Sequence, residues 1–336
     1  MTGTTTDFSK AVTSFLTDYL PLQRGYSKNT ILSYRDTLKL FVLFLTEDKD
    51  MKLSKFTMAD FSRPLIVEFL EWCRSRGCSV STTNQRLAAL KSFSSFAQIE
   101  YIDYIAPLLD VQAVRSKKTE GREISFLSAE QMSKLINYPD ANTCSGLRHR
   151  TALTLLYDSG CRVQELCDIK LKDINTNTNP TLRLHGKGDK YRTVVIDDKT
   201  ARLVKEYIIR LRSGAMPDHP LITNRSGKSI SRDGIQYIID KYVSKIHNED
   251  CSFPAHVHCH QFRHSKAMHM LAANINIVYI RDFLGHEDIS TTMIYSRADN
   301  RLKNEAINAL APKVTDNINL PDWRADSELL SFLNSF

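Results

Sequence analysis

The chain is 336 residues long, which favours two domains over one. Hydrophobic residues make up 42% of it and charged residues 25%, with only 12 glycines and 10 prolines, so the composition excludes a disordered, collagen-like or turn-rich all-β protein. The net charge of +7 permits an anionic partner without identifying one.

The first part of the chain, residues 1–108, is predicted to be a compact bundle of helices. Apolar residues recur at three- and four-residue steps in four stretches: 8–20, 31–45, 65–72 and 87–97. Pro21 is expected to end the first helix, and the hydroxyl of Ser27 is placed to cap the second. Four helices with short connections typically pack into one bundle.

Polar residues on the last of these helices form a stripe opposite its apolar face. Asn84 and Lys91 are seven residues apart and therefore lie two helical turns apart on one side. The stripe could follow a DNA groove and touch phosphates and base edges, although by itself it fits the wet side of a bundle helix better. A basic linker is predicted next, over residues 109–124. Its candidate DNA contacts are Arg115, Lys117 and Lys118.

Residues 125–312 mix helical and strand patterns, which predicts a helix-rich α+β domain with a small antiparallel sheet. Two strand-like stretches, Thr181–Leu184 and Tyr191–Ile196, are joined by a hairpin turn. Ser128 and Gln131 stand at the spacing of a capping box. Helical patterns cover the ranges 147–158, 199–213, 231–246, 261–273, 276–284 and 300–310. The last segment, 313–336, is an acidic, amphipathic tail.

The seven cysteines follow no regular framework, which indicates reduced thiols and a cytoplasmic location. Cysteine and histidine are dense between Cys251 and His260, but the second ligand pair of a structural zinc site is missing, so a zinc module there is the weakest alternative. The densest apolar run, Leu40–Leu45, is too short to cross a membrane. We expect no metal, no cofactor and no membrane contact.

Four separated elements carry residue types that together suit chemistry on a phosphodiester. They are Ser159–Leu166 with Arg162 and Glu165, the hairpin turn with Lys187, the helix start His260-Gln-Phe-Arg263-His264, and Leu284-Gly-His286 followed by Tyr295. Two arginines can hold the non-bridging oxygens of one phosphate and neutralise the charge that grows in the transition state. Histidine and lysine can transfer protons, and a tyrosine hydroxyl can form a covalent phosphoester.

Each element alone has a simpler explanation. Arg162 with Glu165 is most often a helix ion pair, Lys187 a solvated turn residue, and Tyr295 a half-buried core tyrosine. The order and spacing of all four favour the chemical interpretation.

In this order the residues resemble those of the tyrosine recombinase family, also called the phage integrase family. The resemblance spans nearly the whole chain and rests on Arg…Lys…His-x-x-Arg…His…Tyr, on Leu-Gly-His followed nine residues later by tyrosine, and on His-x-Phe-Arg-His. It implies a helical core-binding domain of the SAM-like kind, a basic linker and a catalytic domain. Ser296 and Arg297 depart from the further histidine that many members have, at a position without a catalytic role.

The resemblance implies that Arg162 and Arg263 bind the phosphate and that Tyr295 attacks it. Lys187 would protonate the leaving 5′-oxygen, and His260 and His286 would be the active-site histidines. Glu165 would support the site from behind these residues. Lys190 stands in the same turn as Lys187, and only the Gly-Lys-Gly context of the resemblance favours Lys187.

The resemblance further implies a site-specific recombinase that works through a 3′-phosphotyrosyl intermediate and a Holliday junction. Its partner would be double-stranded DNA, bound at two sites by a homo-tetramer, with no small-molecule substrate. The sequence around Tyr295 is similar to members from mobile elements, which favours integration or transposition. Alternatives are Xer-like dimer resolution, DNA relaxation by a type IB topoisomerase, and a DNA-binding regulator that does not cleave.

Overall fold

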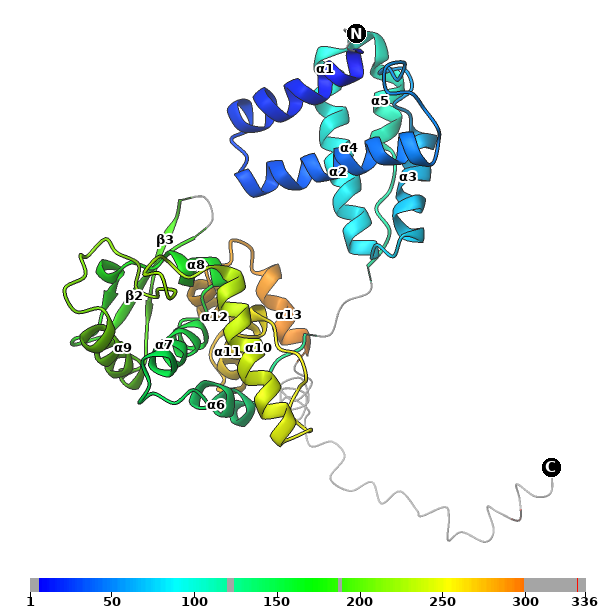
Figure 1. Ribbon diagram of the computed structural model, residues 1–336. Helices are drawn as coiled ribbons and strands as arrows, with labels where there is room; N and C mark the ends of the chain where they lie inside the picture. Colours follow the sequence, from blue (N-terminus) through cyan, green and yellow to red (C-terminus); the bar gives the residue numbers. More distant parts are fainter. Residues whose placement is uncertain (1–5, 120–123, 187–188, 299–330, 332–336) are drawn as a thin grey trace. The chain divides into compact units, whose positions relative to one another are not determined.

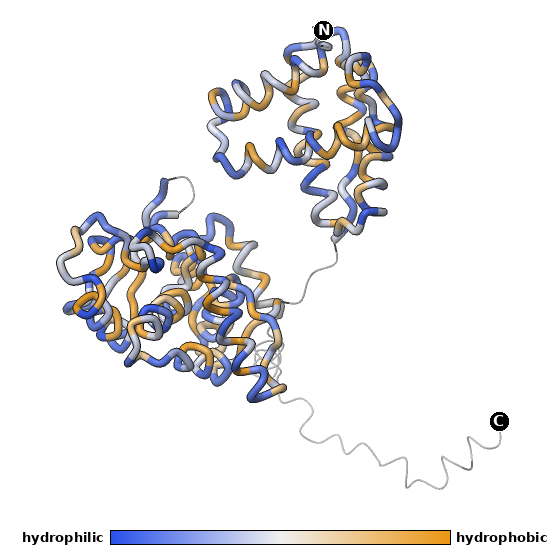
Figure 2. Tube along the Cα trace, in the orientation of Figure 1, coloured by the Kyte–Doolittle hydropathy of each residue, from blue (hydrophilic) through white to orange (hydrophobic). Residues whose placement is uncertain are grey.

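The computed structural model describes residues 6–119, 124–186, 189–298 and 331, and its chain divides into two compact units, Met1–Arg122 and Glu123–Phe336 (Figure 1). The fold class is the predicted one: a helical bundle, followed by a helix-rich unit with a three-stranded antiparallel sheet. Hydrophobic and hydrophilic residues alternate along the helices of both units, as amphipathic packing requires (Figure 2).

The first unit is built from helices around a core rich in phenylalanine. The helices are α1 (Asp7–Ser14), η1 (Phe15–Gln23), α2 (Lys28–Glu47), α3 (Arg63–Ser75), α4 (Val80–Glu100), η2 (Ile102–Tyr104) and α5 (Ile105–Gln112). Ser27 accepts a hydrogen bond from the backbone N–H of Thr30, which confirms the predicted cap. Phe41, Phe61 and Phe93 are fully buried, and their rings meet edge to face.

Two features of this unit differ from the sequence-based expectation. Pro21 does not end the first helix, because the chain continues as the π-helix Phe15–Gln23, whose wider turn accommodates the proline ring. The helix α5 was not foreseen, and it continues past residue 108. Val111 and Val114 are buried in the same core, so packing of this unit extends into the segment expected to be linker.

The polar stripe of α4 contacts the chain's own α5 and the segment after it. The Asn84 carboxamide donates to the carbonyl of Lys117 at 2.8 Å and accepts from its backbone N–H at 3.0 Å. Gln112 in α5 donates to the carbonyl of Lys91 at 2.7 Å and to Ser95 at 3.1 Å. The stripe therefore holds α5 and the segment after it against the bundle. This intramolecular role differs from both sequence-based interpretations, a DNA-contacting stripe and a solvent-exposed helix face.

The second unit contains helices and one small sheet, against which α8 packs. Its elements are α6 (Ala129–Asn137), α7 (Cys144–Asp158), α8 (Val163–Asp168), η3 (Leu171–Asp173), β1 (Ile174–Asn175), β2 (Thr181–His185), β3 (Tyr191–Val195), α9 (Asp198–Leu211), α10 (Arg232–Glu249), α11 (Cys259–Ala272), α12 (Ile277–Leu284) and α13 (Ser290–Ala298). The capping box of Ser128 and Gln131 is confirmed. The predicted helix 300–310 and the tail 313–336 lie outside the described residues, apart from residue 331.

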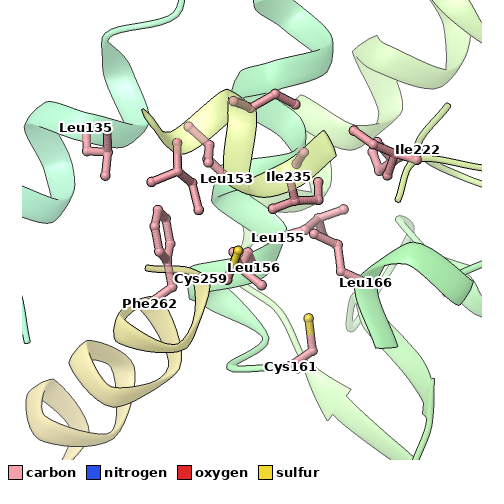
Figure 3. Close-up of a cluster of buried hydrophobic side chains, with 14 of the residues drawn as sticks. Leu135, Leu153, Leu155, Leu156, Cys161, Leu166, Ile222, Ile235, Cys259 and Phe262 are labelled. Atoms are coloured by element: carbon pink, nitrogen blue, oxygen red, sulfur yellow. The ribbon is translucent and has the colours of Figure 1, made fainter. Parts of the chain in front are cut away.

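The core of this unit joins helices that are far apart in sequence. Figure 3 shows leucines of α7, among them Leu153 and Leu156, gathered with Ile235 of α10 and with Phe262 of α11. This packing holds the start of α11 against the end of α7, which are the two places where the sequence puts its candidate arginines.

The sheet supplies a hairpin that projects from the body of the unit (Figure 1). Its strand order is β1-β2-β3, all antiparallel, and His185 pairs with Tyr191 at the last step before the turn. Within the described segments, no helix is both long and apolar enough to cross a membrane.

Candidate active site

The first arginine of the site stands at the junction of α7 and α8, beside a buried carboxylate. Glu165 is 5% exposed and accepts hydrogen bonds from the backbone N–H of Arg162 at 2.8 Å and from Arg162 Nη1 at 3.0 Å. Arg192 of β3 binds the same carboxylate with both Nη atoms at 2.8 Å. One acidic side chain therefore orients two guanidinium groups, which agrees with the supporting role expected for Glu165.

The second arginine, Arg263, is in the first turn of α11 and is only 4% exposed. Its Nη1 donates to the carbonyl of Gly160 and its Nη2 to the carbonyl of Leu284, both at 2.8 Å. These two carbonyls fix the guanidinium between the end of α7 and the end of α12. A guanidinium carries five N–H donors, so further donors are left for a ligand.

Two predicted histidines flank this arginine. His260 is one helical turn before Arg263 in α11. His286 follows Gly285, the left-handed residue that ends α12, and its Nδ1 lies 2.8 Å from the hydroxyl of Thr292 in α13. Arg162, Lys190 and His286 line one open pocket with a volume of about 540 Å³.

The predicted nucleophile is close to these groups but is buried. Tyr295 is 2% exposed, and its hydroxyl lies 2.9 Å from Nδ1 of His264. Its ring packs with Ile280 and Leu284, and is nearly parallel to the ring of His286 at a centroid distance of 6.5 Å. The sequence had suggested a core tyrosine with a surface hydroxyl as the simpler explanation, whereas this hydroxyl is enclosed.

The hairpin turn is only partly described. Lys187 lies outside the described residues. Lys190, the other lysine of the turn, forms an ion pair with Glu287 at 2.9 Å. The choice between the two lysines as proton donor therefore stays a prediction.

Burial and positive charge shape the protonation of the site. Burial lowers the pKa of His286 to about 4, and the positive charges of Arg263, Arg162 and Arg192 contribute. Burial also lowers the pKa of His260, with contributions from Arg263 and Arg162. Burial lowers the pKa of Arg263 to about 10, which leaves it charged at neutral pH. Neutral histidines beside charged arginines favour an anionic ligand that needs donors and one proton acceptor, as a phosphodiester in reaction does.

The low histidine pKa values predict a loss of stability in weak acid. His286 and the distant His149, whose pKa burial also lowers to about 4, are neutral in the folded protein at neutral pH, whereas in the unfolded chain they titrate near the ordinary histidine pKa of 6.5. Between these pH values the unfolded chain binds more protons, so stability falls as the pH drops from 6.5 towards 4. Thermal melting across this range should show it, and His149→Gln, which keeps a partner for Tyr242, should make the decline shallower. An equally steep decline in that variant would contradict this assignment.

The remaining predicted residues take other places. Arg115, Lys117 and Lys118 are exposed at the end of the first unit, and Lys91 is partly exposed. Among the described residues, no three histidine, cysteine or acidic side chains converge as a metal site would require. Cys251 is exposed and Cys259 is buried, so the dense Cys–His segment is spread over different surroundings.

Sequence reasoning missed two side chains of the site, Arg192 and His264. Arg192 shares its side of β3 with the buried Val194, which turns it inward, but its partner is 27 residues earlier, and no local pattern joins the two. His264 follows Arg263 directly, and only the packing of α13 on α11 brings Tyr295 to it.

Comparison with known proteins places this fold and site in one class. Residues 125–301 match the phage integrase family, and residues 13–100 match the phage integrase N-terminal SAM-like domain. The chain belongs to the phage integrase family of tyrosine recombinases, and by that membership it is an enzyme of the class that breaks and rejoins DNA strands.

Several relatives cover most of the chain. A protein of Sinorhizobium fredii that carries the name integrase/recombinase is 31% identical over 96% of this chain and 96% of its own. Tyrosine recombinase XerC of Staphylococcus carnosus is 31% identical over 84% of this chain and 90% of its own.

Solved structures share the fold. The XerH site-specific recombinase bound to its difH substrate matches with a TM-score of 0.64 and 22% identity, over 87% of this chain and 83% of that one. The Tn1549 transposon integrase in complex with transposon right end DNA matches with a TM-score of 0.67 and 17% identity, over 90% of this chain and 99% of that one.

Proposed function

We propose that the protein is a site-specific tyrosine recombinase that cuts and rejoins double-stranded DNA through a 3′-phosphotyrosyl intermediate. One observation carries the proposal: Arg162, Arg263 and His286 converge with Tyr295, and the stacked rings of His286 and Tyr295 tie the nucleophile to the pocket. Two fixed guanidinium groups can hold the two non-bridging oxygens of a phosphodiester and balance the charge of its transition state.

The reaction exchanges one phosphoester for another. The phenolic oxygen of Tyr295 bonds to phosphorus and gives its proton to a neutral histidine of the site. The bond from phosphorus to the 5′-oxygen breaks, and that oxygen takes a proton from Lys187 or Lys190. Because the new ester replaces the old one, the step needs no external energy source. A 5′-hydroxyl of a second duplex then attacks the phosphotyrosine, and a repeat of the exchange passes through a Holliday junction.

Attack requires a movement of α13. A hydroxyl that is 2% exposed and bonded to His264 cannot reach a phosphate in the open pocket. We place this movement after DNA binding, when the protein assembles as a homo-tetramer on two sites. The N-terminal bundle with α5, the rest of the predicted linker up to residue 124, the catalytic domain 125–312 and the tail 313–336 would then act as separate parts of one cytoplasmic enzyme.

DNA would also contact the exposed cations of the first unit, Lys91, Arg115, Lys117 and Lys118. Asn84 is a weaker candidate, because contact with a base would require it to break both hydrogen bonds to Lys117.

Two biological roles agree with the relatives. Integration or transposition of a mobile element is favoured by the Tn1549 integrase neighbour and by the relative named integrase/recombinase. Resolution of chromosome or plasmid dimers is favoured by the identity with XerC and XerD proteins.

A paired-site assay tests the proposed function. The protein's own site is first isolated by selection from fragments of its replicon, and two linear duplexes of unequal length that carry the site are then mixed. A recombinase should give two products of exchanged lengths. Relaxation of a supercoiled plasmid without exchanged products would show a type IB topoisomerase instead, and binding without cleavage would show a regulator.

A further inference from the structure

The guanidinium of Arg192 is the one buried cation of the site that the mechanism above does not use. We infer that Arg192 is a positioning residue for proton delivery: with Glu165 it fixes the base of the hairpin, Gly186 and Lys190. The candidate proton donors are Lys190 itself and Lys187, which follows Gly186 in the sequence. This inference rests on the proposed function and adds to it a residue that directs the leaving-group step.

Arg192 connects three elements of the site. Its side chain is 15% exposed and forms a two-pronged ion pair with Glu165 at the start of α8, while its Nε donates to the carbonyl of Phe283 near the end of α12 at 3.2 Å. Because every nitrogen of the guanidinium is engaged, the side chain has one fixed orientation. β3 is thereby tied to both α8 and α12.

The turn begins directly on this ion pair. A Cβ atom placed on Gly186 would lie 3.5 Å from Oε1 of Glu165 and 3.7 Å from Nη1 of Arg192, so Gly186 faces both partners with room for one methyl group between them. Its N–H donates to the carbonyl of Lys190 at 2.7 Å, which closes the base of the turn. Gly186 and Lys190 thus join β2 to β3 two residues before Arg192, so a displacement of the ion pair is passed to the base of the turn.

The other side of Arg192 is equally restricted. A Cβ atom on Gly285 would come within 2.8 Å of its Cδ and 3.0 Å of its Nε, closer than any side chain could be accommodated without a shift. Gly285 also has a φ of +67°, which favours glycine. Because Gly285 has no side chain, Arg192 can occupy the space next to the end of α12.

The role can be separated from phosphate binding by the choice of leaving group. In a nicked substrate whose scissile 5′-oxygen is replaced by sulfur, the departing thiolate needs no proton, since its acid is far stronger than an alcohol. A variant that fails to deliver the proton should therefore be slow with the oxygen substrate and normal with the sulfur substrate. Loss of a phosphate-binding group should slow both.

The test compares adduct formation on the two substrates by Arg192→Lys, which keeps the charge but lacks the planar fork that binds Glu165 twice while reaching the carbonyl of Phe283. We expect a loss of about tenfold to a hundredfold on oxygen, within the range of general acid catalysis, and a rate on sulfur within about threefold of the wild type. The double variant Lys187→Ala/Lys190→Ala supplies the reference ratio. Arg183→Lys, which exchanges an arginine of β2 that pairs with Asp173, is the matched control and should behave as wild type.

Taking both rates from one sample makes their ratio independent of the folded fraction, so partial unfolding of a variant leaves the test valid. Equal losses of Arg192→Lys on both substrates, or no loss on either, would overturn the inference. A wild-type protein that forms no adduct on either substrate would instead refute the proposed function, and with it the inference.

Discussion

Exchange of Tyr295 for phenylalanine is expected to abolish covalent adduct formation with DNA completely. The change removes the attacking oxygen and leaves the ring to pack with Ile280 and Leu284, so the domain should still fold. The assay uses a substrate nicked beside the cleavage position. Cleavage then releases a short fragment with a free 5′-hydroxyl, which diffuses away and cannot reverse the reaction, so the covalent complex accumulates. Wild type should give a protein–DNA band that survives denaturation, and the variant none.

The chain offers a closely matched control for this experiment. Tyr157 also forms a hydrogen bond with a histidine of α11, with its hydroxyl 2.9 Å from Nδ1 of His269. Tyr157→Phe loses the same kind of hydrogen bond in the same unit without loss of the nucleophile, and it should retain the adduct. An adduct that persists in Tyr295→Phe would place the nucleophile elsewhere.

Replacement of Arg263 by alanine should slow adduct formation by about a thousandfold or more, as loss of a transition-state donor does in other enzymes. This corresponds to about 4 kcal/mol of barrier. The guanidinium is held by the carbonyls of Gly160 and Leu284, so its direction is set before DNA binds. The measurement is the single-turnover rate with enzyme in excess, so that weaker DNA binding does not enter.

Arg212→Ala is the control for this second prediction. Arg212 also binds a backbone carbonyl, that of Pro220 at 2.9 Å, and is partly buried, whereas Arg263 is buried. Its removal should lower the melting temperature without a matching loss of rate. If Arg212→Ala and Arg263→Ala slowed the reaction equally, the role of Arg263 would be structural.

Much of the candidate site could be predicted because its residues stand at fixed local spacings. His260 and Arg263 are one helical turn apart, and the capping position of Arg162 with Glu165 three residues later is a local pattern as well. Gly285 before His286 marks the end of a helix in the left-handed conformation. Such features depend on residue spacings within one helix or turn, which can be read from the sequence.

What could not be predicted depends on contacts between distant segments. The pairing of Arg192 with Glu165 requires the hairpin to fold onto α8, and the burial of Tyr295 requires α13 to pack on α11. The same holds for α5, whose packing against α4 occupies Asn84 and Ser95 with bonds to the chain itself. Hydrophobic periodicity and composition describe each segment separately and carry no information about contacts between distant segments.

The most direct measurement identifies the atom that becomes bonded to DNA. Adduct trapped on the nicked substrate is digested with nuclease and protease, and the peptide that retains a nucleotide is sequenced by tandem mass spectrometry. The account predicts a phosphoester on the hydroxyl of Tyr295, in the peptide from α13. A nucleotide attached to any other side chain, or an adduct joined to the 5′ end of the cleaved strand, would contradict it.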